Sequence, residues 1–150
     1  MVELNEIYNF LRLSDDLLTA GQPTAAQYPS IAAAGVRTVI NLALPSSDGA
    51  LPDEAGLARS LGLDYVHIPV VWENPQREDF ETFARAMDAL NDQRLLVHCA
   101  ANMRVSAFIA LYRVRRLGWP KERALADTQR IWDPYTNPVW GKFMDEVLAG

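Results

Sequence analysis

The chain has 150 residues, of which 49% are hydrophobic and 22% are charged, and its net charge is −5. This length and composition predict a single domain over residues 1–150 with a continuous core and without low-complexity or disordered tracts. The negative charge and the lack of a basic run argue against nucleic-acid partners, and no apolar run is long enough for a membrane helix. The acidic N-terminus lacks a signal-peptide layout, and the lone cysteine, Cys99, excludes an intrachain disulfide, so we expect a cytoplasmic protein.

Strand and helix patterns alternate along the chain. The β-branched run Val36–Leu42 is typical of a strand, whereas the apolar residues of 78–90 recur at helical spacing. Strands are expected at residues 17–20, 36–42, 64–70 and 95–98, and helices at 1–13, 24–34, 53–61, 78–90, 104–117, 120–132 and 138–148. This order predicts an α/β domain with a mostly parallel central sheet of four to five strands flanked by helices.

Cys99 lies at the carboxyl end of the apolar run Leu95–His98 and just before a predicted helix. A short apolar run suggests a strand buried on both faces, and ligands of open α/β sheets bind at the carboxyl ends of such strands. The free N–H groups and positive end of the following helix favour a thiolate or a bound phosphate. This position predicts an anion-binding loop rather than a merely buried thiol.

The residues after Cys99 suit a loop that curls around a phosphate. Ala100 and Ala101 are small, and Asn102 tolerates the left-handed backbone that such loops need. Arg104 offers a planar fork matched to two phosphate oxygens. The expected substrate-binding residues are therefore Ala100, Ala101, Asn102, Met103, Arg104 and Ser106.

Two neighbours of this loop are expected to support it. Ser106 is close enough in sequence to donate to the thiolate or to a loop carbonyl, and His98 could orient the loop through backbone hydrogen bonds. The chemistry would be nucleophilic: the Cys99 thiolate attacks phosphorus, and water then hydrolyses the cysteinyl-phosphate. The two histidines and the cysteine do not have the spacing of metal ligands, so neither a metal nor another cofactor is expected.

The segment His98–Ser106 resembles the signature of the protein tyrosine and dual-specificity phosphatases, in which His-Cys, five residues, Arg and Ser or Thr follow one another. The wider chain is similar to the bacterial DUF442-type phosphatases of that superfamily and to the phosphatase-like domain of beta-lactamase-hydrolase-like proteins. The segments that carry this resemblance are Thr19–Pro23, Val39–Leu42, His67–Val70 and His98–Ser106, within residues 14–117. The resemblance implies a dual-specificity-phosphatase-like fold without a metal and a phosphorylated protein or small molecule as substrate.

The chain departs from this signature in the length of the loop. Four residues, not five, separate Cys99 from Arg104, and Asn102 stands in place of the usual glycine. Either the shorter loop still delivers Arg104 to the phosphate, or Arg104 points elsewhere and the loop binds anions without efficient turnover. The spacing alone leaves both readings open.

The general acid is the second departure. The family supplies an Asp from the loop after the strand that matches His67–Val70, but here that loop contains Glu73 as its nearest carboxylate. Glu73 is the first choice for the acid, and Asp48, in the loop after the preceding strand, is the alternative. Both loops are expected at the same edge of the sheet as Cys99, where Trp72 could form a wall of the cleft.

Three functions fit these residues. The leading hypothesis is a cysteine-dependent phosphatase that uses Cys99, Arg104 and Glu73, and the alternative is a pseudo-phosphatase that binds phosphorylated or anionic ligands without turnover. A third, weaker hypothesis is sulfur transfer or arsenate reduction at a related cysteine loop.

Overall fold

The computed structural model describes residues 3–150 and shows an open α/β fold around a five-stranded sheet of order β1-β2-β5-β3-β4. The strands are β1 (Leu11–Arg12), β2 (Leu17–Ala20), β3 (Thr38–Asn41), β4 (Asp64–His67) and β5 (Leu95–His98). All strand pairs are parallel except β1 with β2, which confirms the predicted mostly parallel sheet.

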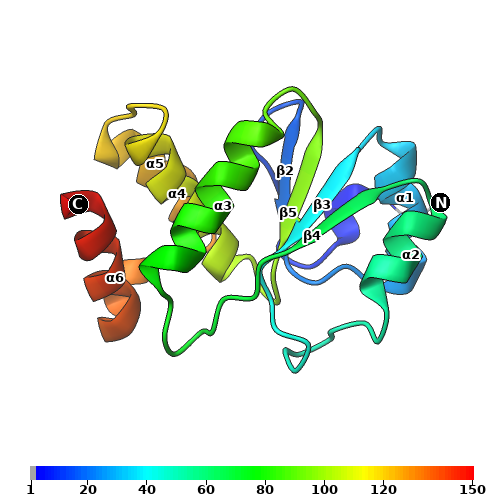
Figure 1. Ribbon diagram of the computed structural model, residues 1–150, viewed down its shortest axis with the longest axis horizontal. Coiled ribbons are helices and arrows are strands. Elements are labelled where there is room, and N and C mark those ends of the chain that lie inside the picture. Colours follow the sequence, from blue (N-terminus) through cyan, green and yellow to red (C-terminus); the bar gives the residue numbers. More distant parts are fainter. Residues whose placement is uncertain (1–2) are drawn as a thin grey trace.

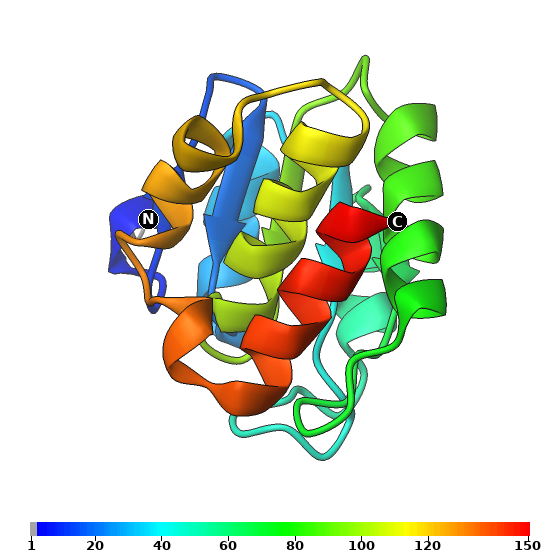
Figure 2. The same cartoon turned by 90° about the vertical axis from the view of Figure 1, so that its left-hand side faces the viewer.

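Helices cover both faces of this sheet (Figure 1). Helices α3 (Arg77–Ala89), α4 (Met103–Arg115), α5 (Lys121–Thr128) and α6 (Pro138–Ala149) lie on one side, where Figure 2 shows α4 and α6 across the sheet. The other side carries α1 (Tyr28–Ala33) and α2 (Glu54–Ser60). Short 3₁₀ turns η1 (Leu4–Glu6), η2 (Ala25–Gln27) and η3 (Pro134–Thr136) complete the element order.

The central strand β5 divides its side chains between two cores. Leu95 and Val97 pack with the α3–α6 side, whereas Leu96 packs with the α1–α2 side. Successive side chains of a strand point to opposite faces, so the side chains of a strand covered on both faces are buried at every position. All four residues of β5 are buried, as predicted, and the carboxyl end of the strand is held firmly between two layers.

Two expected helices differ from the structure. Residues 1–13 were predicted to form a helix, but the described part contains η1 and then β1, which pairs with β2. A short helix is only marginally stable by itself, so pairing with the sheet prevails. The helix predicted to reach Trp132 ends at Thr128, because the chain turns there and the Trp132 indole bonds to another element. Residues 1 and 2 of the first prediction lie outside the described residues.

Among the residues that the structure describes, none of the helices has both the length and the apolar character needed to cross a membrane.

Candidate functional site

The loop after β5 passes directly into helix α4. Cys99 follows the strand, and Asn102 caps the helix with a left-handed backbone at φ 63°, as the sequence predicted for this position. Met103, Arg104 and Val105 form the first helical turn, whose N–H groups have no carbonyl partner inside the helix. These groups and the positive end of the α4 dipole are the features that favour an anion. Cys99 itself is only 1% exposed.

The back of the loop is held by the segment around Gly21. A side chain at Gly21 would lie 2.7 Å from the Ala100 oxygen and 2.9 Å from the Tyr8 oxygen, so only glycine lets these backbones approach. The Gln22 N–H donates to the Ala100 oxygen at 3.0 Å. This contact explains the position of Thr19–Pro23 beside the loop in three dimensions.

A pair of asparagines completes this support. Asn9 donates through Nδ2 to the Ala101 oxygen at 3.0 Å, and Asn102 donates back to the Asn9 oxygen at 2.9 Å. Asn102 Nδ2 also reaches Thr19 Oγ1 at 3.1 Å. The two asparagines therefore tie the loop to the N-terminal segment.

Arg104 is 6% exposed and donates from Nη1 to the Val70 oxygen at 2.8 Å. No carboxylate lies within ion-pair distance of it in residues 3–150. The guanidinium is thus fixed by one carbonyl beyond β4, and its other donors are not occupied by an acidic side chain.

Five of the predicted site residues line one cavity of about 300 Å³: Asp48, Trp72, Glu73, Ala100 and Arg104. Cys99, His98, Ala101, Asn102, Met103 and Ser106 do not line it. The loop contributes Ala100 and Arg104, and the two predicted acid loops face them from the same edge of the sheet, as expected. The full lining is Leu44, Ser46, Ser47, Asp48, Trp72, Glu73, Ala100 and Arg104. Trp72 forms part of the wall, in agreement with the sequence prediction.

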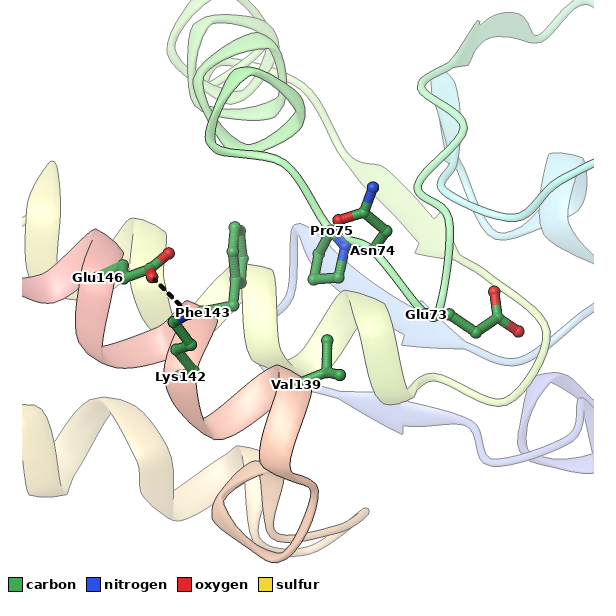
Figure 3. A pocket seen from close by; sticks show the side chains of 7 residues that line it. All are labelled: Glu73, Asn74, Pro75, Val139, Lys142, Phe143 and Glu146. Carbon is green, nitrogen blue, oxygen red and sulfur yellow. Dashed lines mark ion pairs between the residues drawn. The ribbon is translucent and has the colours of Figure 1, made fainter.

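Both candidate acids are exposed. Glu73 and Asp48 line the cavity on opposite loops, and no hydrogen bond or ion pair holds either carboxylate among the described residues. Glu73 also borders a second surface cavity of about 260 Å³ against α6. Figure 3 shows that its carboxylate points away from Lys142 and Glu146, which pair with each other across 3.9 Å. The Glu73 side chain is therefore free to serve the first cavity.

The C-terminal elements support the start of α4 through tryptophans. Trp132 Nε1 donates to the Met103 oxygen at 2.9 Å and approaches Ser106 Oγ at 3.2 Å. Ser106 Oγ donates to the same Met103 oxygen at 3.1 Å, which is the carbonyl option of the sequence prediction rather than the thiolate option. Trp140 Nε1 donates to the Trp72 oxygen at 2.9 Å and so anchors the loop that carries Glu73.

A buried polar network lies behind the loop, and its centre is Glu54, a residue that no local sequence pattern indicated. His98 is fully buried, its Nδ1 lies 3.1 Å from the Cys99 oxygen, and its Nε2 lies 2.5 Å from Glu54 Oε2. Glu54 also accepts from the Tyr28 hydroxyl and, at 2.9 Å, from Gln22 Nε2. His98 thus contacts the loop backbone at the Cys99 carbonyl, and its orienting role stays a prediction.

The ionisation of Glu54 follows from these contacts. Burial disfavours its charged form, but the hydrogen bond and charge of His98, followed by the donors Tyr28 and Gln22, outweigh burial and keep the pKa of Glu54 below 4.5. Burial and the adjacent Glu54 raise the pKa of Tyr28. The only sequence signal for Glu54 was indirect: a histidine in a doubly covered strand requires a polar partner.

Comparisons with known proteins agree with this geometry. The model of the family described as "DSP-PTPase phosphatase fused to NAD+ Kinase" matches residues 10–134. The "Beta-lactamase hydrolase-like protein" of Xylella fastidiosa (strain Temecula1) is 32% identical over 108 residues, which is 68% of this chain. The chain spans about a quarter of the length of that relative, with 24% covered.

Solved structures extend the match. A DUF442 protein from Shewanella putrefaciens CN-32 is 40% identical, with a TM-score of 0.88 over 97% of this chain and 95% of that chain. P. aeruginosa TpbA in complex with pTyr has a TM-score of 0.73 over 99% of this chain and 92% of its own, but at 18% identity it shows the shared fold alone. On the family model and the identity to its relatives, this protein belongs to the DSP-PTPase phosphatase family, as a DUF442-type member of the protein tyrosine and dual-specificity phosphatase superfamily.

Proposed function

We propose that this protein hydrolyses phosphate monoesters without a metal, through a cysteinyl-phosphate on Cys99. The observation that supports the proposal most is the common cavity, in which Ala100 and Arg104 face the carboxylates of Glu73 and Asp48. The family membership supports the same chemistry. The proposed substrate is a phosphorylated protein or small molecule, and the proposed compartment is the cytoplasm, where the Cys99 thiol stays reduced.

The proposed reaction has two steps. The Cys99 thiolate attacks phosphorus while the P–O bond to the leaving group breaks, and Glu73 donates a proton to the leaving oxygen. Water then attacks the cysteinyl-phosphate, Glu73 takes up a proton from it, and the thiolate leaves. Arg104 and the first amides of α4 bind the phosphoryl oxygens throughout both steps.

Phosphate release from an aryl phosphate tests the nucleophile and the arginine. Cys99→Ser is expected to abolish turnover, and Arg104→Lys to lower kcat by about 100-fold, because an ammonium cannot replace the planar fork. Arg130→Lys, at an exposed arginine of the α5 end, is the matched control and is expected to keep full activity. Equal rates of the wild type and Cys99→Ser would refute the catalytic proposal.

Substrates with different leaving groups distinguish the two candidate acids, Glu73 and Asp48. Loss of a general acid slows cleavage of esters with poor leaving groups by about 100-fold or more, but it hardly affects cleavage of esters whose weakly basic leaving group departs unaided as an anion. Glu73→Gln is therefore expected to slow the first step with an alkyl phosphate much more than the first step with nitrophenyl phosphate, whose release of nitrophenolate in the first turnover is expected to stay nearly unchanged. The same pattern in Asp48→Asn instead would assign the acid to Asp48.

The pseudo-phosphatase alternative rests on specific observations: Cys99 is 1% exposed, and the loop to Arg104 is one residue short. Calorimetric titration with inorganic phosphate separates the two functions. Tight phosphate binding by the wild type without turnover of any ester would favour a binding module.

A further inference from the structure

Glu54 has no part in the proposed reaction, yet it is one of the most deeply buried acids of the chain, with 6% exposure. It starts helix α2 and reaches His98 at the end of β5, 44 residues further along the chain. Burial of an isolated carboxylate lowers the stability of the folded state, so a network that keeps Glu54 buried suggests a functional role for it.

The hydrogen-bond partners fix the protons of this network. The Cys99 carbonyl can only accept, so His98 Nδ1, 3.1 Å away, carries a hydrogen. Glu54 receives the Tyr28 hydroxyl and the Gln22 amide besides the imidazole, and a carboxylate that collects donors in this way is ionised. His98 Nε2 faces this carboxylate, so both ring nitrogens of His98 have an acceptor oxygen as partner.

We propose that Glu54 is a positioning residue that holds His98 doubly protonated, so that a fixed positive charge lies directly behind Cys99 and favours its thiolate. The proposal rests on the proposed function, because it assigns Glu54 to the activation of the same cysteine. The positive end of the ion pair lies on the Cys99 side, since Nδ1 bonds the Cys99 carbonyl and Glu54 lies beyond Nε2.

Other titratable groups near the pair are already engaged elsewhere. Tyr65 of β4 accepts from Asn41 Nδ2 at 2.9 Å, His67 Nε2 lies 2.6 Å from the Ala43 oxygen, and Asp53 accepts from the Gly56 N–H at 3.0 Å. Tyr28 of α1 donates to Glu54 itself. Within residues 3–150, Glu54 is the one carboxylate paired with His98, so no second acid can replace it.

The direction in which Glu54→Gln shifts the thiol titration of Cys99 tests the proposal. A fully buried histidine without its counter-ion loses its proton, so the positive end behind Cys99 disappears and the thiolate becomes harder to form. If His98 instead kept its proton without Glu54, the removal of a negative charge would make the thiolate easier to form. The two cases move the thiol titration in opposite directions.

Cys99 is the only cysteine of the chain, so the ultraviolet absorbance of its thiolate can be followed against pH without interference from other thiols. Cys99→Ser serves as the blank. Glu54→Gln is expected to raise the midpoint by about one pH unit relative to the wild type. Glu122→Gln, at an exposed position of α5, is the matched control and is expected to leave it unchanged. An unchanged or lowered midpoint in folded Glu54→Gln would overturn the proposal.

A second measurement needs only the wild type. The chain has two histidines, so the side-chain ¹⁵N resonances of His98 are assigned by comparison with His67→Gln. Both ring nitrogens of His98 are expected to be protonated at neutral pH, and a neutral ring would overturn the proposal even if Glu54→Gln does not fold. Neither readout depends on turnover, so a protein that hydrolyses no ester would refute the proposed function and leave this inference standing.

Discussion

Replacement of Asn102 by alanine tests how the shortened loop keeps its shape. Asn102 has φ 63°, and its amide donates to the Asn9 oxygen and to Thr19 Oγ1. Alanine in a left-handed backbone costs about 1 kcal/mol, and each lost hydrogen bond costs about 1 kcal/mol more. The Asn102 Oδ1 is buried without a hydrogen-bond partner among residues 3–150, so its removal returns about 1 kcal/mol. The expected net loss is about 2 kcal/mol of unfolding free energy.

Glycine at the same position separates the two causes. It loses the same side-chain hydrogen bonds but adopts the left-handed backbone freely, so Asn102→Gly is expected to be about 1 kcal/mol more stable than Asn102→Ala. Urea unfolding followed by the fluorescence of the four tryptophans measures both variants. Asn91→Ala, in an exposed turn, is the control and is expected to change stability by less than about 0.5 kcal/mol. Equal urea midpoints for the alanine and glycine variants would refute the backbone argument.

Three further predictions concern the elements around the loop. Gly21→Ala is expected to lower the unfolding free energy by about 2 kcal/mol or more in urea titrations, because its Cβ would meet the Ala100 oxygen at 2.7 Å. Trp132→Phe removes the donor to the Met103 oxygen, and we expect a loss of about 1 kcal/mol in the same assay and weaker phosphate binding by calorimetry; unchanged binding would contradict a supporting role. The lowered pKa of Glu54 adds stability above its ordinary value of 4.5, and this stability is lost as pH falls through the lower folded-state pKa. The unfolding free energy of the wild type should therefore fall more steeply on acidification than that of Glu54→Gln. Parallel curves of unfolding free energy against pH would argue against this contribution of Glu54.

The parts of the site that the sequence predicted are those set by local pattern and by sheet geometry. The run Leu95–His98 predicted a strand buried on both faces, and the helix after it predicted the anion-binding end. The rule that parallel strands end at one edge placed Asp48 and Glu73 opposite the loop, and the cavity lining contains both. These inferences need no knowledge of distant contacts.

Other features depend on contacts that no local pattern encodes. Glu54 and His98 are far apart in the chain, and at the start of α2 a glutamate has an ordinary reason to occur, since it favours the helix dipole. Residues 1–13 contain enough apolar residues for a short helix, but pairing of β1 with β2 decides the outcome. Trp132 leaves the predicted helix for the same kind of reason, because its partner is the Met103 carbonyl.

The spacing between Cys99 and Arg104 shows why counting residues could not decide where the arginine points. Each residue of an α-helix turns the side-chain direction by about 100°, so an arginine one residue earlier points differently unless another group corrects it. Arg104 is the second residue of α4, and the Val70 carbonyl beyond β4 holds its Nη1 at 2.8 Å. That carbonyl lies in the segment after β4, the strand beside β3, and this segment continues to Trp72 and Glu73 at the cavity. The direction of Arg104 therefore depends both on the loop length and on the path of the chain after β4. A loop that is one residue shorter can keep its arginine at the cavity only if the segment after β4 supplies a carbonyl acceptor that redirects the guanidinium.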